Sequence, residues 1–455
     1  MMVTRRTVLL TMSITSFYGA RLLSSMIKLM NSKRHASSLF SHAISELNKE
    51  NTSSSFYDSI GRPRFISAPM VDQSSLSWRV LVKRHGADLA FSQMMHARNF
   101  QKDRKYRLEC IDWDDYTHIS GSKDKEQEAK LDDRPIIVQF AGNDPNILVN
   151  AGKLIHKDVN AIDLNLGCPQ KIAKRGNYGA YLLNNEKVIV ECLSAMVANL
   201  DCPITAKVRK LENDEDTIRL CQKIEQCGVQ MLTIHGRTVS SSKLFTGPCD
   251  WDIIRKVKAA LHIPVIANGG ISCRSDALAC LEYTGADGVM SSEALLENPK
   301  LFSESGDLLF RTDFIRFQLE TVKEYRELVL SYPPPRPLFQ VVRSHLFKML
   351  YRFVDAPRHA DLRATLAMGD RDEMFAVIDE LEERLGAAGL LKSEDAADSS
   401  REEWAMQQGL LGPTHWYMRH RDERAATRVL STPRQKLHPS SSSSINSSIS
   451  SSSRS

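Results

Sequence analysis

Eight short stretches of apolar or alternating residues recur along the middle of the chain, and helical patterns separate most of them. In the clearest stretch, apolar Ile162, Leu164 and Leu166 stand at every second position with polar residues between them, which is the period of a β-strand. The predicted strands are 65–70, 88–93, 135–140, 161–166, 204–209, 230–235, 264–268 and 287–291.

Between most of these strands the apolar residues follow the 3.6-residue period of a helix. Eight alternating strand and helix units over roughly 240 residues match the size of a TIM barrel, so we expect an α/β fold built as a TIM (β/α)8 barrel. A doubly wound sheet is the alternative, but eight regularly spaced strands favour closure. The helical patterns cover 146–157, 186–200, 214–227, 251–261 and 275–283, with Asp214, Asp250 and Ser275 at N-cap positions.

Polar residues stand at the carboxyl ends of the predicted strands. From the third strand to the seventh they are Gln139, Cys168, Lys207, His235 and Asn268. If the barrel closes, these ends meet at one mouth, which is where barrel enzymes place their active sites. Cys168 stands between Gly167 and Pro169, in a turn, and this position favours a chemical role over that of a small buried hydrophobe.

Two loops are predicted near the mouth. Segment 94–134 is long, polar and charged, and a loop of this kind shapes access to a site or simply varies. Segment 174–180 contains two glycines and two cations, which predicts a mobile, positively charged loop beside Cys168.

Only helical patterns follow the barrel. One predicted helix carries Arg343, His345, Lys348 and Arg352 at helical spacings, which on charge pattern alone is typical of a solvated face. We expect a barrel at 61–305 and a small helical domain at 306–392, with helices at 314–330, 338–354, 358–367 and 371–385.

The two ends of the chain have unusual compositions. Segment 1–60 is basic and rich in Ser and Thr, and no Asp or Glu precedes Glu46, which indicates a transit peptide or a disordered extension, with a signal peptide as a further interpretation. We therefore expect a cytoplasmic or organellar protein, and no stable membrane insertion, because Arg21 and the hydroxyl residues disfavour a spanning helix. Segment 393–455 is basic and then nearly all Ser, which predicts a disordered tail.

Composition narrows the class of protein. Of the 455 residues, 42% are hydrophobic and 25% are charged, which suits a globular chain of more than one domain. The formal net charge of +5 permits a nucleic-acid partner without requiring one. The nine cysteines contain no CxxC pair, so we expect a reducing compartment and neither a disulfide framework nor a metal site.

The residues at the predicted mouth suit an anionic, aromatic cofactor. Lysine is rarely buried without a partner, so Lys207 in a barrel favours a nearby anion or electron-rich ring over a structural polar plug. Asn268, Gly269 and Gly270 precede a helix and offer backbone N–H groups to a phosphate after the seventh strand. With Gln139 across the mouth, this set suits flavin mononucleotide (FMN).

Several motifs together resemble the tRNA-dihydrouridine synthase family, from about residue 64 to about residue 385. They are APMV at 68–71, LNLGCPQ at 164–170, KRGNYGA at 174–180, KVR at 207–209, HGRT at 235–238 and NGG at 268–270. In addition, VMSSE at 289–293 followed by NPKLF at 298–302 is similar to the eukaryotic branch that acts on positions sixteen and seventeen of the tRNA D-loop.

The resemblance implies an FMN-bearing barrel with a helical tRNA-binding domain, which reduces the C5=C6 bond of uridine with NADPH or NADH. It implies that Cys168 is the general acid that protonates C5 while reduced flavin delivers hydride to C6. The implied FMN-binding residues are Pro69, Met70, Val71, Gln139, Lys207, His235, Asn268, Gly269, Gly270, Ser292 and Glu293. The implied RNA-binding residues are Lys174, Arg175, Arg343, His345, Lys348 and Arg352.

One position departs from many bacterial relatives, which carry Gly-Arg where this chain has Ser292 and Glu293. Because a carboxylate cannot neutralise a phosphate, backbone N–H groups or a cation such as Arg274 would have to substitute. Two other functions stay open: a flavin barrel dehydrogenase acting on a free pyrimidine, and a non-catalytic RNA-binding protein. The helical appendage argues against the first, and an intact Cys168 and Lys207 argue against the second.

Overall fold

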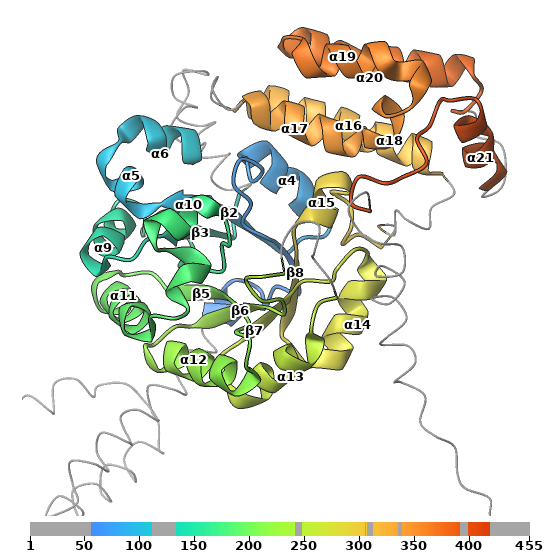
Figure 1. Ribbon diagram of the computed structural model, residues 1–455. Helices are drawn as coiled ribbons and strands as arrows, with labels where there is room; N and C mark the ends of the chain where they lie inside the picture. The colour runs from blue at the N-terminus through green and yellow to red at the C-terminus, as the bar shows by residue number, and fades with distance from the viewer. Residues whose placement is uncertain are drawn as a thin grey trace, which may run out of the picture. The chain divides into compact units, whose positions relative to one another are not determined.

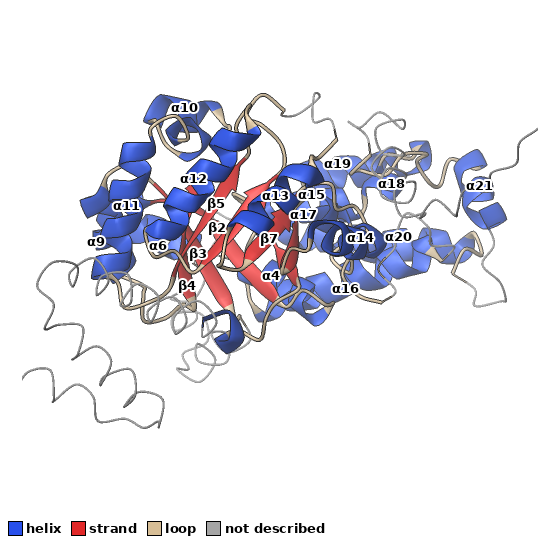
Figure 2. Cartoon of the chain, turned by 90° about the horizontal axis from the view of Figure 1, so that it is seen from below, coloured by secondary structure: helices blue, strands red, loops and turns tan. Residues whose placement is uncertain are grey.

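Eight parallel strands close into a barrel in chain order, with β1 paired to β8 (Figures 1 and 2). The computed structural model describes residues 56–111, 133–241, 248–304, 306, 313–334, 339–391 and 399–418. The predicted barrel is confirmed, with small shifts at the strand ends. The strands are β1 (Phe65–Ser67), β2 (Leu89–His96), β3 (Ile136–Ala141), β4 (Ala161–Leu166), β5 (Ile204–Arg209), β6 (Met231–His235), β7 (Val265–Asn268) and β8 (Gly288–Ser291).

The alternating pattern of the sequence sorts side chains between the barrel interior and the surrounding helices. Ile162, Leu164 and Leu166 of β4 are buried in the large core between the sheet and its helices. Asp163 and Asn165 point the other way, because successive side chains of a strand lie on opposite faces. The neighbouring strand β5 repeats this alternation in register with β4. The polar residues of both strands therefore gather inside the barrel.

Helices cover the outside of the barrel, and every helix predicted between the strands is present. Asp250 caps α13 as predicted, because its carboxylate accepts a hydrogen bond from the Ile253 amide (3.1 Å). The other two predicted caps are wrong, since Asn213 caps α12 and Cys273 precedes α14. These outer helices are α4 (Leu76–Arg84), α9 (Pro145–Lys153), α11 (Glu186–Asn199), α12 (Asp214–Gln226), α13 (Trp251–Ala260) and α14 (Arg274–Thr284).

Both loops predicted near the mouth contain helices. The insertion after β2 begins with α5 (Ala97–Lys102) and α6 (Arg104–Cys110), and its residues 112–132 lie outside the described residues. The segment predicted as a mobile basic loop instead forms the end of α10 (Lys171–Gly176) and the start of the 3-10 helix η1 (Gly179–Leu182). Asn177 ends α10 in the left-handed conformation (φ 48°).

The barrel domain begins earlier than the predicted boundary at residue 61. Phe56, Tyr57 and Ile60 are buried and belong to the apolar cluster that includes the inward-facing Ile66 and Met231. Their apolar side chains are buried against the barrel interior. The sequence did not indicate this, because the three residues follow a long basic segment and were assigned to it. Segment 1–55, where a transit peptide was predicted, lies outside the described residues.

The C-terminal helices pack against α4 of the barrel (Figure 1). Trp78 of α4 stacks on the His345 ring with 4.2 Å between the ring centroids, and the Tyr325 hydroxyl is hydrogen-bonded to His345 Nδ1 (2.6 Å). These contacts join the helical part directly to the barrel. The elements of the helical part are α15 (Glu293–Glu297), α16 (Phe314–Ser331), α17 (Phe339–Met349), α18 (Tyr351–Val354), η5 (Pro357–His359), α19 (Ala360–Met368), α20 (Arg371–Ala387) and α21 (Ser399–Gln407).

Two residues predicted to contact tRNA are buried in this helical part. His345 is completely buried, and its Nε2 lies 3.1 Å from the Gln73 carbonyl oxygen. The buried Arg352 guanidinium donates hydrogen bonds to the Gly412 carbonyl (3.0 Å) and to the Glu402 carboxylate (2.9 Å). The prediction that His345 and Arg352 face tRNA is therefore wrong, because both side chains find their partners inside the protein.

The other two cations of this predicted RNA-binding set are half-buried. Arg343 donates hydrogen bonds to the carbonyls of Ala367 (2.9 Å) and Gly369 at the C-terminal end of α19. The Lys348 ammonium donates to Gln73 Oε1 (2.6 Å) in the barrel. Both residues therefore stabilise packing within the protein, and a contact with tRNA phosphates would compete with these bonds.

The predicted disordered tail also needs correction. Helix α21 and the segment that follows it lie within 393–455, and Leu410 and Leu411 are buried. The sequence did not indicate this structure, because two apolar side chains stand within a region that is otherwise mainly polar. The Ser-rich stretch from residue 439 lies outside the described residues.

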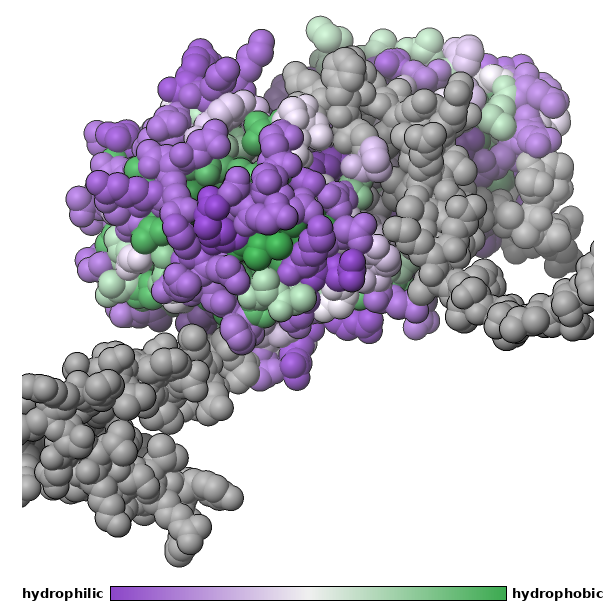
Figure 3. Space-filling model, turned by 60° about the horizontal axis from the view of Figure 1, so that its bottom comes forward, coloured by the Kyte–Doolittle hydropathy of each residue, from purple (hydrophilic) through white to green (hydrophobic). Residues whose placement is uncertain are grey.

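The outer face of the barrel in Figure 3 is mainly hydrophilic, with small, scattered hydrophobic spots. No helix in the described ranges is long and apolar enough to cross a membrane. Within the same ranges, His, Cys, Asp and Glu side chains form no group of three or more that could hold a metal ion.

The ion pair between Arg79 and Asp133 gives a test of stability. Both side chains are buried, and the guanidinium donates to both carboxylate oxygens, at 2.8 Å from Nε and 2.6 Å from Nη2. Asp133→Asn should lower the free energy of unfolding by about 3–5 kcal/mol, because it leaves a buried guanidinium without its counter-charge. Urea unfolding should report this loss.

The matched control is Asp372→Asn, which removes the exposed partner of Arg371 and should change stability by less than about 1 kcal/mol. Equal effects of the two substitutions would show that the buried pair contributes no more than a surface pair.

Candidate active site

Cys168 occupies a fixed position at the mouth of the barrel, directly after β4. Asn165 Oδ1 accepts hydrogen bonds from the amides of Gly167 (3.2 Å) and Cys168 (3.0 Å). The Cys168 carbonyl accepts from the Ala180 amide (3.1 Å). Next to it, Gly179 has φ +63°, and a Cβ there would lie 2.9 Å from the Cys168 carbonyl oxygen, so only glycine fits. The thiol is thus held by backbone contacts on both sides.

A chain of buried polar side chains supports this loop from inside the barrel. The Asp163 carboxylate accepts hydrogen bonds from Thr205 Oγ1 (2.7 Å) and Gln139 Nε2 (2.8 Å). Gln139 Oε1 in turn accepts from Asn165 Nδ2 (2.8 Å), which leaves Asn165 Oδ1 to hold the backbone of Cys168. The network therefore fixes which way both amide side chains point.

Burial sets the protonation states of this part of the site. Burial raises the pKa of the Cys168 thiol above its ordinary value, and the nearby Arg209 and Lys207 oppose the shift only in part. Cys168 is therefore a protonated thiol at neutral pH, able to give up a proton. Burial also raises the pKa of Asp163 to about 6, although its hydrogen bonds to Thr205 and Gln139 act in the opposite direction.

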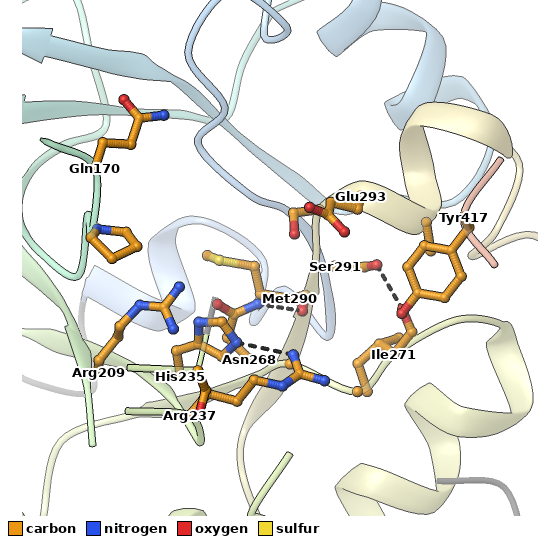
Figure 4. Close-up of a pocket in the computed structure, with 16 residues that line it drawn as sticks. Gln170, Arg209, His235, Arg237, Asn268, Ile271, Met290, Ser291, Glu293 and Tyr417 are labelled. Atoms are coloured by element: carbon orange, nitrogen blue, oxygen red, sulfur yellow. Dashed lines mark hydrogen bonds between the residues drawn. The ribbon is translucent and has the colours of Figure 1, made fainter. Parts of the chain in front are cut away.

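A cavity of about 320 Å³ opens beside this loop, between β6, β7 and β8 (Figure 4). Figure 4 shows Arg209, His235 and Arg237 on one side of the cavity, and Tyr417 beside Ile271 on the other. Its lining comes from the loop after β4, the ends of β5 to β8, the start of α15 and the C-terminal segment. The residues are Pro169, Gln170, Arg209, His235, Arg237, Ser241, Asn268, Gly269, Gly270, Ile271, Met290, Ser291, Ser292, Glu293, Ala294 and Tyr417.

Arg209 and Arg237 line one side of the cavity, and Lys207 contacts the lining residue Asn268. Burial and the cations Arg209, Lys207 and Arg237 hold the pKa of His235 well below its ordinary value, so its imidazole is neutral. His235 Nε2 lies 3.3 Å from Arg237 Nη1, which is always a donor, and Nε2 is therefore the acceptor. Burial and Arg209 lower the pKa of Lys207 to about 8. So much positive charge favours an anionic ligand.

The turn after β7 has the shape of an anion cradle. Gly269 and Gly270 have φ of +104° and +79°, and a Cβ on Gly269 would lie 2.6 Å from the His235 ring. Asn268 lies between Lys207 Nζ, which donates to its Oδ1 (2.8 Å), and the Met290 carbonyl, which accepts from its Nδ2 (2.9 Å). This turn, which carries no side chains and lies beside two guanidinium groups, fits the phosphate of a bound nucleotide.

The structure brings most of the predicted cofactor residues together. Lys207 contacts the cavity residue Asn268, whereas Gln139 is completely buried below the site, with both ends of its amide hydrogen-bonded. Gln139 therefore supports the site, and a direct contact with a cofactor would require it to move. Pro69, Met70 and Val71 follow β1 but are not among the lining residues. The predicted residues in the lining are His235, Asn268, Gly269, Gly270, Ser292 and Glu293.

Ten of the sixteen lining residues were not predicted as cofactor residues, and Arg237 and Tyr417 are the two whose side chains matter most for a ligand. Arg237, within the HGRT motif, faces the cavity, whereas Arg274 packs over the Phe65 ring (5.1 Å) and donates to the Phe302 carbonyl. Arg237 and Arg209, rather than Arg274, thus supply the charge opposite Glu293. Arg237 could have been identified from the sequence, because it follows the carboxyl end of β6 by two residues. No sequence signal pointed to Tyr417.

The predicted cations next to Cys168 remain available at the surface. Lys174 and Arg175 are exposed in the last turn of α10, a few residues after the thiol. Their predicted contact with RNA stays a prediction.

The family model and the curated relatives point to the same family. The model described as "Dihydrouridine synthase (Dus)" matches residues 66–374. A tRNA-dihydrouridine(16/17) synthase-like protein of Mus musculus is 39% identical over 308 residues, which cover 68% of this chain and 59% of the relative. The tRNA-dihydrouridine(16/17) synthase of Saccharomyces cerevisiae is 37% identical over 329 residues, covering 72% and 74%. The corresponding Rattus norvegicus protein is covered over 64% of its length, so the chain spans about three fifths of the rodent relatives. A family match over the whole barrel and much of the helical part means that this chain belongs to the dihydrouridine synthase family.

Proposed function

We propose that this protein reduces uridine to 5,6-dihydrouridine in tRNA, at positions sixteen and seventeen of the D-loop, with FMN as cofactor and NADPH or NADH as electron donor. Membership of the family supports the reaction, and the names of the mouse and yeast relatives support the position and the nicotinamide. The observation that carries the proposal is Cys168, a protonated thiol fixed directly beside a cation-lined cavity.

The thiol of Cys168 acts in this proposal as the proton donor to C5 of uridine. Its raised pKa keeps the proton on sulfur at neutral pH, and the Asn165 contact holds the loop so that the sulfur does not drift from the substrate. A reduced flavin, when bound, supplies the hydride for C6. Arg209 and Lys207 lie close enough to lower the pKa of Cys168, and they stabilise the thiolate that remains after proton transfer.

The cavity residues fit FMN rather than a neutral flavin. Arg209 and Arg237 give the lining two guanidinium groups against the single carboxylate of Glu293. The Gly269–Gly270 turn presents backbone in place of side chains, as a close approach to a phosphate requires. In this proposal Lys207 holds Asn268 in place and favours negative charge on the neighbouring ring.

The uridine has to leave the tRNA stack to reach the barrel mouth. A D-loop uridine is unpaired, so this step costs less than extruding a base from a duplex. The exposed Lys174 and Arg175 on α10 are the proposed phosphate contacts nearest to Cys168.

Cys168→Ala should strongly slow uridine reduction while the fold and bound flavin remain. Loss of the general acid should slow single-turnover formation of dihydrouridine by about 10²–10⁴-fold. Oxidation of NADPH by the flavin should continue. Cys227→Ala, at the C-terminal end of α12, is the control and should keep the full rate. Equal rates for Cys168→Ala and the parent protein would contradict the assignment.

Lys207→Met should weaken FMN binding or slow flavin reduction, by about tenfold, because it removes a charged hydrogen bond to Asn268 and a cation from the site. Flavin titration and stopped-flow reduction by NADPH measure the two effects. Lys210→Met serves as the control, since its ammonium pairs with Asp250 (2.7 Å) outside the cavity lining. If flavin affinity, potential and reduction rate all match those of the parent, Lys207 is only structural.

The double variant Lys174→Ala/Arg175→Ala should raise the Michaelis constant for tRNA and flatten its dependence on salt, because each phosphate contact releases counterions. Flavin reduction by NADPH should not change. The control is Lys153→Ala/Lys157→Ala, which removes two exposed cations, one at the end of α9 and one after it, at the opposite end of the barrel. An unchanged affinity for tRNA across a salt series would exclude α10 from the RNA interface.

A further inference from the structure

The C-terminal strap, residues 410–418, contributes to the cavity although it lies outside the segment that matches the family. Its Tyr417 is a lining residue and lies beside Ile271 and Ser291, next to the start of α15 (Figure 4). A residue more than a hundred positions beyond β8 in the chain therefore completes one wall of the candidate cofactor site.

One buried carboxylate holds the strap in place. Glu297 Oε1 accepts hydrogen bonds from His415 Nδ1 (2.7 Å) and the Trp416 amide (3.1 Å), and its Oε2 accepts from the Tyr417 amide (2.9 Å). The Glu297 side chain is only 3% exposed. A buried carboxylate needs such donors, so the strap and Glu297 depend on each other.

A second charged side chain, the guanidinium of Arg352, also binds the strap. Arg352 donates to the Gly412 carbonyl (3.0 Å), and its Nη1 lies 3.3 Å from His415 Nε2. Because the guanidinium can only donate, His415 Nε2 is the acceptor, and Nδ1 therefore carries the proton that Glu297 accepts. His415 thus links Glu297 and Arg352 with consistent hydrogen-bond directions. At the start of the strap, Leu410 and Leu411 are buried.

The short helix α15 couples the strap to the cavity. Ser292, Glu293 and Ala294, at the start of this helix, line the cavity, and Glu297 at its end binds the strap. Helix α15 therefore both forms the cavity wall after β8 and holds the backbone of Tyr417 through Glu297. The loops after the seventh and eighth strands are where barrels commonly bind phosphate.

We propose that Tyr417 is a cofactor-binding residue that closes the phosphate end of the cavity, and that Glu297 is the positioning residue that holds it there. This inference rests on the proposed function, since the ligand it closes over is FMN. A phenol suits this place because its ring excludes water from the phosphate and its hydroxyl can donate to a phosphate oxygen. The strap then slows the loss of FMN from the protein.

The test is flavin titration of the full chain, with Tyr417→Ala and Glu297→Ala compared with the parent. Tyr417→Ala should raise the Kd for FMN about tenfold, the effect of losing one hydrogen bond to a charged group. It should change the Kd for riboflavin, which has no phosphate, by less than about twofold. Glu297→Ala should shift the Kd for FMN in the same direction and should speed hydrogen exchange at the amides of Trp416 and Tyr417. The control is Glu403→Ala, which removes an exposed carboxylate of α21.

The outcomes separate this inference from the proposed function. If the parent protein binds no flavin, the proposed function itself fails. If the parent binds FMN and Tyr417→Ala binds it equally well, or loses affinity for riboflavin to the same extent, the role of Tyr417 at the phosphate end is overturned. Should Glu297→Ala fail to fold, the titration of Tyr417→Ala still decides the question.

Discussion

The buried carboxylate of Asp163 is the constraint on which the candidate site depends. A carboxylate inside a barrel is tolerated only when donors satisfy it, and Thr205 and Gln139 do so. Once Gln139 donates to Asp163, its carbonyl must receive Asn165, and Asn165 must then turn its own oxygen towards the backbone of Cys168. The position of the proposed acid therefore follows from hydrogen bonds made one layer deeper in the barrel.

Burial raises the pKa of Cys168 and lowers the pKa of His235, and both side chains are therefore neutral at neutral pH. It keeps the proton on the thiol of Cys168 and removes the charge from His235, so one can donate a proton while the other accepts a hydrogen bond from Arg237. Arg209 and Arg237 bring two guanidinium groups to the cavity, and the glycine turn after β7 lines the same cavity with backbone. The cavity is thus suited to an anion, and the adjacent loop after β4 to proton transfer.

The sequence was sufficient to predict the barrel because a strand's two-residue period and the polar residues at its end are local patterns. It was not sufficient to predict which cations bind groups inside the protein and which face solvent. Arg343 and Arg352 donate to carbonyls of Ala367 and Gly412, which come from distant parts of the chain, and helical spacing carries no information about such partners. Tyr417 was missed for the same reason: its place in the cavity is set by Glu297, over a hundred residues earlier, within a region whose composition suggested disorder.

A single-turnover reaction tests the central claim most directly. The protein is reduced anaerobically with NADPH and mixed with unmodified tRNA, and dihydrouridine is then mapped base by base while flavin oxidation is followed optically. We expect the uridines at positions sixteen and seventeen to be reduced in step with flavin oxidation, and free uridine, uracil and orotate to remain unreduced. Reduction of a free pyrimidine with the tRNA left unchanged, or a failure of the protein to bind any flavin, would contradict it.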